Sequence, residues 1–176
     1  TVATSRSQRD VVINQLGDGI PVVTEPERRD TFPAIALASS YLACERKCSA
    51  DEVVIVMPCD PYTEAGYFET IRRMAEAVKN DAAELVLMGI RPTYPSAQYG
   101  YVVPVPGNDE SGIYRVSRFT EKPDVPTAGR LISEGAFWNG GVFAFRLGYM
   151  IDIVARYIQT DIFAEIRSRY VEFPKI

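Results

Sequence analysis

The chain has 176 residues, 47% hydrophobic and 24% charged, which predicts a single compact domain able to bury a core. Its net charge of −4 and pI near 5.0 argue against nucleic acid as a partner, because a phosphate polymer would be repelled on average. The absence of histidine excludes Ser-His-Asp and Cys-His catalysis, so a general base would be Asp, Glu, Lys or Tyr.

The sequence shows neither a signal-peptide pattern nor an apolar run near the roughly 20 residues that cross a bilayer. Cys44, Cys48 and Cys59 are an odd, sparse set, which favours free thiols in a reducing compartment over a disulfide framework. Zinc is disfavoured because no histidine and no fourth soft ligand are present. We therefore predict a cytoplasmic protein without a membrane partner.

Short apolar runs alternate with longer amphipathic ones in the first half, as is typical of an α/β domain. The β-branched run at 53–57 and the apolar run at 85–90 predict buried strands, with a helix at 63–79 between them. Segments of this kind predict a parallel, doubly wound, Rossmann-like sheet. The other elements expected here are helices at 7–16 and 31–47 and a short strand at 22–23.

In the second half, strand-like segments follow one another with a polar turn between the first two. This pattern predicts a partly antiparallel extension of the mostly parallel sheet. A polar turn at 106–112 joins the first two of its strands. The strands expected are 99–105, 113–119 and 142–145, and the helices are 126–133, 147–157 and 160–169.

Asp60 directly follows the run at 53–57, in Pro58-Cys59-Asp60-Pro61. Ligands of open α/β sheets bind beyond the carboxyl ends of strands, where a carboxylate can hold Mg²⁺ beside a phosphate. An N-cap or turn aspartate before the next helix explains the same position, and the spacing leaves both readings open.

The segment from Glu25 to Ala34 is a polar turn that leads into a helix. Free N–H groups at a helix N-terminus favour acceptors such as a phosphate or a base carbonyl. A charged surface turn with an ordinary cap would look the same, and Asp30 or Thr31 could supply that cap.

Glu121-Lys122-Pro123 and Trp138-Asn139 place polar groups beside strand-like segments. Lys122 can pair with a phosphate, and the carboxylate and amide can bind hydroxyl groups. A solvated lysine and a core tryptophan are the alternatives. Gly100 lies between two tyrosines, where it either admits a ligand close to the backbone or marks a bulge.

These motifs occur together in one order, and the chain resembles the sugar-1-phosphate nucleotidyltransferases, among them the mannose-1-phosphate guanylyltransferases. The similar segments are Glu25-Pro26 with 29–38, Val56-Met57-Pro58-Cys59-Asp60, 89–95, Tyr99-Gly100-Tyr101, Glu121-Lys122-Pro123 and Trp138-Asn139. This resemblance implies a GT-A-like nucleotidyltransferase fold and the reaction of GTP with mannose 1-phosphate to give GDP-mannose and pyrophosphate, with Mg²⁺.

The resemblance also implies roles for individual residues. Asp60 would hold Mg²⁺ and, with Lys122, be catalytic. Lys122 would bind the sugar phosphate together with Gly100, Glu121 and Asn139. The nucleotide would lie against Glu25, Arg29, Asp30 and Thr31. GTP and mannose 1-phosphate are thus the expected small-molecule partners, and a homodimer is the candidate assembly.

The chain departs from the family pattern at several positions. Pro61 replaces a histidine, Asp30 an asparagine and Gly140 a serine. The family's glycine-rich N-terminal loop and its second metal carboxylate have no counterpart in 1–176, so we expect this chain alone to be nearly inactive. The alternatives are a nucleotidyltransferase for another nucleotide and sugar phosphate, or a non-catalytic regulatory subunit that binds nucleotide sugars.

Overall fold

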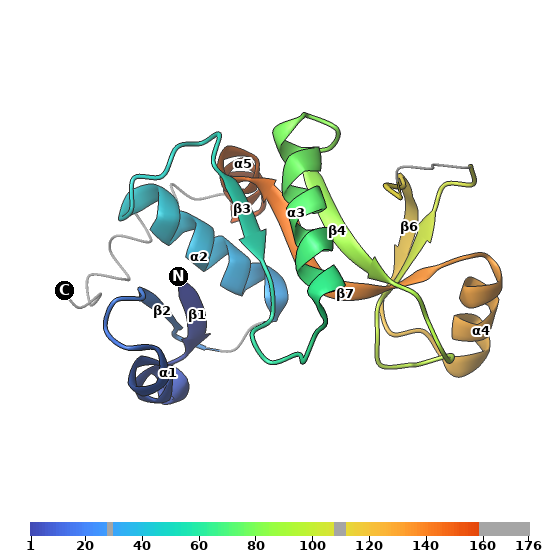
Figure 1. Cartoon of the computed structure of the whole chain (residues 1–176), viewed down its shortest axis with the longest axis horizontal. Helices are drawn as coiled ribbons and strands as arrows, with labels where there is room; N and C mark the ends of the chain where they lie inside the picture. The colour runs from blue at the N-terminus through green and yellow to red at the C-terminus, as the bar shows by residue number, and fades with distance from the viewer. Residues whose placement is uncertain (28–29, 108–111, 159–176) are drawn as a thin grey trace. The chain divides into compact units, whose positions relative to one another are not determined.

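The computed structural model describes residues 1–27, 30–107 and 112–158, in an α/β arrangement (Figure 1). The predicted helix at 160–169 and Arg29 lie outside the described residues. The chain divides into two compact units, residues 1–54 with 145–176 and residues 55–144. The expectation of a single domain stays a prediction. Within the described ranges, no helix is long and apolar enough to cross a membrane.

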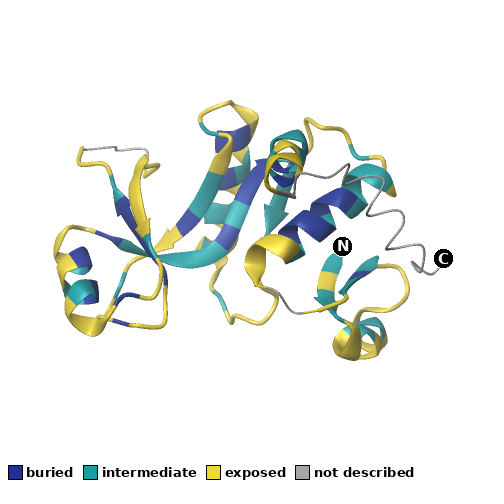
Figure 2. Ribbon diagram, turned by 180° about the vertical axis from the view of Figure 1, so that it is seen from behind, coloured by how far each residue is buried: buried dark blue, intermediate teal, exposed yellow. Residues whose placement is uncertain are grey.

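The first unit begins with β1 (Val2–Ser5), a strand that the sequence analysis missed, and β1 pairs in parallel with β2 (Val22–Glu25). A short 3₁₀ turn (Arg6–Gln8) and α1 (Arg9–Leu16) connect them. The helix α2 (Thr31–Cys44) carries the largest buried stretch of this unit, dark blue in Figure 2.

The helix α2 ends three residues earlier than predicted, and Lys47 beyond it has a positive φ of 56°. Cys44 and Cys48 therefore do not share a helix face. The helix α5 (Leu147–Ile158) closes the described part of the first unit and contacts α2, where the rings of Phe32 and Tyr157 meet edge to face at 6.2 Å.

The second sheet has five strands in the order β3-β7-β5-β6, with β4 also paired to β7. The strand β5 runs antiparallel to both β6 and β7, which confirms the predicted antiparallel extension. The strands are β3 (Val53–Val56), β4 (Leu85–Ile90), β5 (Tyr101–Pro104), β6 (Val116–Thr120) and β7 (Phe137–Arg146).

The strand β7 is much longer than the predicted 142–145, because it includes Trp138, Asn139 and two glycines that the apolar pattern excluded. Trp138-Asn139 therefore lies inside a strand rather than before one. The run at 85–90 does form a strand, but Leu85 and Ile90 are 40% and 44% exposed, so its ends are not buried as predicted.

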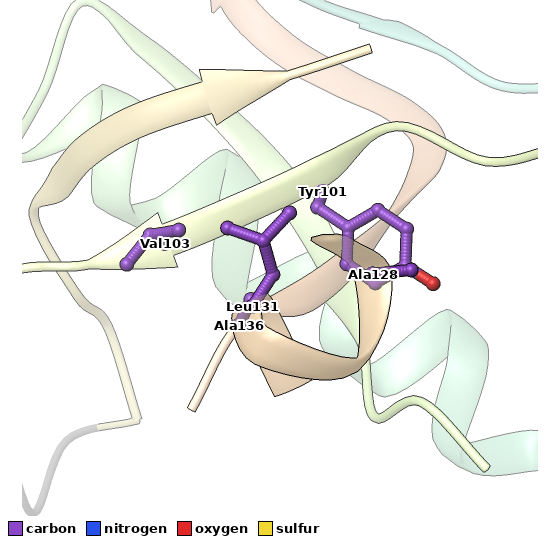
Figure 3. Close-up of a cluster of buried hydrophobic side chains, with 5 residues drawn as sticks. All are labelled: Tyr101, Val103, Ala128, Leu131 and Ala136. Atoms are coloured by element: carbon purple, nitrogen blue, oxygen red, sulfur yellow. The ribbon is translucent and has the colours of Figure 1, made fainter. Parts of the chain in front are cut away.

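Two helices pack on strands of the second unit: α3 (Ala65–Lys79) contacts β4, and α4 (Val125–Ser133) contacts β5. The buried face of α3 carries Met74, Ala77 and Val78, whereas Phe68 in the same helix is 53% exposed. The face of β5 toward α4 forms a compact core of Tyr101, Val103, Ala128, Leu131 and Ala136 (Figure 3).

Candidate functional site

Three of the predicted sugar-binding residues lie in one row across the antiparallel strands. On β5, Tyr101 pairs with Thr120 of β6 and with Trp138 of β7. One position earlier, the same antiparallel register brings Gly100 between Glu121 and Asn139. The Asn139 N–H donates a 2.7 Å hydrogen bond to the Gly100 carbonyl, which fixes one side of this Glu121–Gly100–Asn139 row.

Gly100 has no room for a side chain. A Cβ atom there would lie 2.6 Å from Glu121 Oε2 and 2.6 Å from Phe119 Cζ. The Glu121 carboxylate thus lies over the bare backbone of Gly100. The approach of a ligand to Gly100, which a glycine between two tyrosines suggested, stays a prediction. The requirement for glycine is steric, because its φ is not positive.

Lys122 lies at the open end of this row, directly after Glu121. Its Nζ is 3.2 Å from Glu121 Oε1, and the two side chains are 62% and 55% exposed, so the pair contributes little to stability. Lys122 also has a φ of 43°, in the left-handed region that costs an L-residue free energy. A strained backbone beneath an exposed cation is an observation that favours a binding role.

Asn139 presents its side chain in a defined orientation. Its Oδ1 accepts a hydrogen bond from the Gly141 N–H at 3.1 Å, and Gly141 has a φ of 69° that suits glycine. With the carbonyl oxygen engaged, the amide NH₂ group is the part of Asn139 that can donate to a ligand.

The departure at Gly140 has a packing reason. A Cβ atom at this position would lie 3.0 Å from the Met88 carbonyl oxygen and 3.1 Å from Ile90 Cδ1. In this structure β4 approaches β7 closely, so the serine of the family pattern would need β4 to shift.

Asp60 is an exposed carboxylate in the bend after β3. It is not the N-cap of α3, because Glu64 occupies that position, so the N-cap reading of Asp60 is wrong. Its exposure suits a single carboxylate ligand of Mg²⁺, an ion that keeps several waters and completes its shell with substrate phosphates. The described residues contain no group of three or more acidic, cysteine or histidine side chains that could enclose a metal.

The predicted nucleotide-binding residues belong to the first unit. Glu25 ends β2, where it pairs with Ser5, and Thr31 is the first residue of α2. Asp30 caps α2 by accepting a 3.0 Å hydrogen bond from the Thr31 N–H. Arg29 lies outside the described residues, so its contact with the nucleotide stays a prediction.

Among the predicted site residues that the structure describes, Asp30 has the least favourable backbone. Its φ of 74° with ψ of −176° is a combination found almost only for glycine. The two other described nucleotide residues, Glu25 and Thr31, are not positive-φ residues. Strain is therefore concentrated at Asp30 on the nucleotide side and at Lys122 on the sugar side.

Sequence reasoning did not find that two tyrosines contact Trp138. The ring centroids of Tyr94 and Tyr99 lie 5.1 Å and 4.9 Å from that of Trp138. The tyrosines come from the loop before β5 and the tryptophan from β7, so only the strand pairing brings them together. A signal was present in the sequence, since both tyrosines precede the predicted ligand-binding glycine closely.

A separate cavity of about 190 Å³ lies between α3, β4 and β5. Its lining is mostly apolar and includes Met74, Leu87, Val102 and Phe137. None of the predicted site residues lines it, so this cavity is not the predicted sugar site.

Comparison with known proteins agrees with the fold and with the motifs. The chain matches the nucleotidyl transferase family over residues 2–172. It is 34% identical over 147 residues to mannose-1-phosphate guanylyltransferase RfbM of Salmonella typhimurium, covering 81% of this chain and 29% of that protein. It is 30% identical over 169 residues to mannose-1-phosphate guanylyltransferase 2 of Escherichia coli O157:H7, covering 89% and 34%.

Among solved structures, one described as a mannose-1-phosphate geranyltransferase from Thermus thermophilus superposes with a TM-score of 0.72 at 32% identity. The match covers 99% of this chain and 52% of that one. The chain therefore belongs to the nucleotidyl transferase family, and the family predicted from the motifs is confirmed. Its relatives place it with the sugar-1-phosphate type. The chain spans about a third of the length of these curated relatives.

Proposed function

We propose that the protein containing this chain transfers a guanylyl group from GTP to mannose 1-phosphate, giving GDP-mannose and pyrophosphate. In this reaction a sugar-phosphate oxygen forms a bond to the α-phosphorus of GTP while the bond to pyrophosphate breaks. The observation that carries the proposal is the Glu121–Gly100–Asn139 row with Lys122 at its end.

The row provides the chemistry that a hexose 1-phosphate requires. The Glu121 carboxylate can accept hydrogen bonds from sugar hydroxyl groups, and the Asn139 NH₂ can donate one. Gly100 lets the Glu121 carboxylate lie over the backbone and take its place in the row, because no Cβ fills that space. The Lys122 ammonium is exposed and can pair with the phosphate, at the expense of its contact with Glu121.

Phosphoryl-group chemistry of this kind depends on positioning and on neutralising charge more than on a protein base. This fits a chain without histidine. Mg²⁺, with Asp60 as one ligand, would supply the charge neutralisation at the triphosphate. Glu25, Arg29, Asp30 and Thr31 would bind the guanine and ribose, with Thr31 at the N-terminus of α2.

The test is pyrophosphate release by the native protein with GTP, mannose 1-phosphate and Mg²⁺. We expect turnover that requires all three and that falls when any one is omitted. Substituting each of the other nucleoside triphosphates and glucose 1-phosphate in turn gives the specificity. A clear preference for another pair would reject the guanylyl assignment while keeping the family.

A non-catalytic regulatory role is the second candidate, because the strained Asp30 and the proline after Asp60 depart from the family pattern. Binding of GDP-mannose by the native protein, with no pyrophosphate released at any Mg²⁺ concentration, would favour it. Turnover would exclude it.

A further inference from the structure

A cluster of three aromatic rings lies beside the Glu121–Gly100–Asn139 row. Tyr94 meets Trp138 edge to face, with ring planes at 72°, and Tyr99 meets it at 53°. On another side, Trp138 packs against the core that contains Tyr101. Trp138 is the residue before Asn139 and the only tryptophan of the chain. Successive side chains of a strand point to opposite faces, so the indole can affect Asn139 only through the β7 backbone that the two residues share.

The loop that carries both tyrosines is fixed to the strand next to the row. The Tyr101 hydroxyl donates to the Ser96 carbonyl and accepts from the Ser96 N–H, both at 2.9 Å. Ser96 is only 5% exposed. Tyr101 is also the register partner of Trp138. The residue that anchors the tyrosine loop through Ser96 is therefore the cross-strand neighbour of the tryptophan.

Ring contacts, rather than a hydrogen bond, hold the indole among the described residues. Its Nε1 is buried and has no hydrogen-bond partner in the part of the chain that the structure describes. A hydrogen bond would otherwise be expected for a buried indole N–H. Outside its contact with the core, the Trp138 ring is therefore oriented by packing against Tyr94 and Tyr99.

Both tyrosines remain open to solvent, with Tyr94 53% and Tyr99 41% exposed. A hydrogen bond from the neutral Tyr99 hydroxyl to Tyr94, followed by the charge interaction with Tyr94 and by desolvation, raises the pKa of Tyr99 above its ordinary value.

We propose that Tyr94 is a positioning residue for the sugar-phosphate site: with Tyr99 it holds Trp138, and Trp138 fixes the β7 backbone from which the Asn139 N–H binds the Gly100 carbonyl. This inference rests on the proposed function, since it takes a hexose 1-phosphate as the ligand of the row. Tyr94 does not itself touch the ligand in this account.

The test uses Tyr94→Ala and Tyr94→Phe, with Tyr114→Ala as the matched control. Tyr114 is 43% exposed and also packs on a neighbouring ring, that of Phe137 at 5.8 Å. Because Trp138 is the single tryptophan of residues 1–176, the fluorescence of this chain reports on the cluster without a label. Each variant is titrated with mannose 1-phosphate, and its emission is also recorded without ligand.

We expect Tyr94→Ala to shift Trp138 emission to longer wavelength and to weaken mannose 1-phosphate binding by about 2- to 10-fold, as loss of one aromatic pair implies. Tyr94→Phe keeps the ring and should restore binding to within about twofold of the wild type. Tyr114→Ala should leave both the emission and the affinity unchanged. Tyr94→Leu, which keeps apolar bulk without a ring, should behave like Tyr94→Ala and serves if the alanine variant fails to fold.

Equal binding by the wild type and both ring-deleting variants would overturn the positioning role and leave the proposed function intact. The same is true if Tyr94→Phe binds as weakly as Tyr94→Ala, since ring packing would then not be the cause. If the wild type binds neither mannose 1-phosphate nor any other hexose 1-phosphate, the proposed function fails, and this inference fails with it.

Discussion

The two sets of predicted site residues are held in place by different physical means. Strand pairing places Gly100, Glu121 and Asn139. The register of β5 with β6 and with β7 fixes which residue of each neighbouring strand lies opposite Gly100. Asp30 and Thr31 are set by a helix start, where one capping hydrogen bond and a strained φ define the geometry. The comparison indicates that strand register defines the predicted sugar-binding residues, whereas local turn chemistry defines the predicted nucleotide-binding residues.

The largest effect is expected at Lys122, which belongs to the sugar side but shares the strain seen at Asp30. Lys122→Ala should lower the rate of pyrophosphate release by about 100-fold, because a phosphate partner is lost. Lys122→Gly should lower the rate equally but raise stability by up to about 1 kcal/mol, since glycine accepts the positive φ.

Rate assays on the native protein and thermal melts check this pair. Activity retained by the glycine variant alone would show that backbone strain, rather than the ammonium, is what matters at this position.

A second prediction tests whether the row is as rigid as its register suggests. Gly100→Ala should weaken sugar 1-phosphate binding by about 10-fold or more, because the new methyl group displaces the Glu121 carboxylate. Its effect on the melting temperature should be small, since the displaced atoms are the ends of exposed side chains.

The matched control is Gly129→Ala in α4, where a Cβ meets nothing within 4 Å. It should stabilise the protein by about 0.5–1 kcal/mol and leave binding unchanged. Fluorescence titration of Trp138 gives the affinities. If the two variants bind equally well, Gly100 is not part of the ligand site.

A third prediction concerns the nucleotide side. Asp30→Gly loses the capping bond to Thr31 but relieves the strained backbone, so it should be more stable than Asp30→Ala by about 2 kcal/mol. Urea unfolding of both variants measures the difference. Equal stability of the two variants would mean that the backbone at Asp30 relaxes at no cost in free energy. Backbone strain would then not distinguish Asp30 from the residues of the Glu121–Gly100–Asn139 row.

The smallest effect is expected from pH at the N-cap of α4, which lies two residues after Lys122 in the sequence. Asp124 caps α4 by accepting from the Thr127 N–H at 2.9 Å, and hydrogen bonds from Thr127, with help from Arg130, lower its pKa below 3.8. A lowered folded pKa means that the stabilisation is fully present above pH 3.8 and is lost as pH falls through the folded value.

Asp124→Asn keeps the capping ability but does not titrate. We therefore expect the stabilities of wild type and variant to follow pH in parallel near neutrality and to differ in slope only below about pH 5. Thermal melts across this range measure the slope. A difference in slope that persists at pH 7 would contradict a purely local cap.

The sequence alone determined the family, the antiparallel extension and the identity of the polar residues, since motif order and the positions of glycine and proline are local properties. It placed the strand at 85–90 and nearly all of the helix that begins at Thr31, where hydrophobic pattern and capping agree. The sequence did not predict the full length of β7, which contains polar residues and glycines. A long strand tolerates such residues only when neighbouring strands and helices supply the packing, which the local pattern does not show.

Only the tertiary structure decided which of those residues meet. The register of three strands aligned Glu121, Gly100 and Asn139, and it brought Tyr94 and Tyr99 to Trp138. Pairing between segments far apart in the chain depends on how all the side chains pack at once, and no local pattern contains that information.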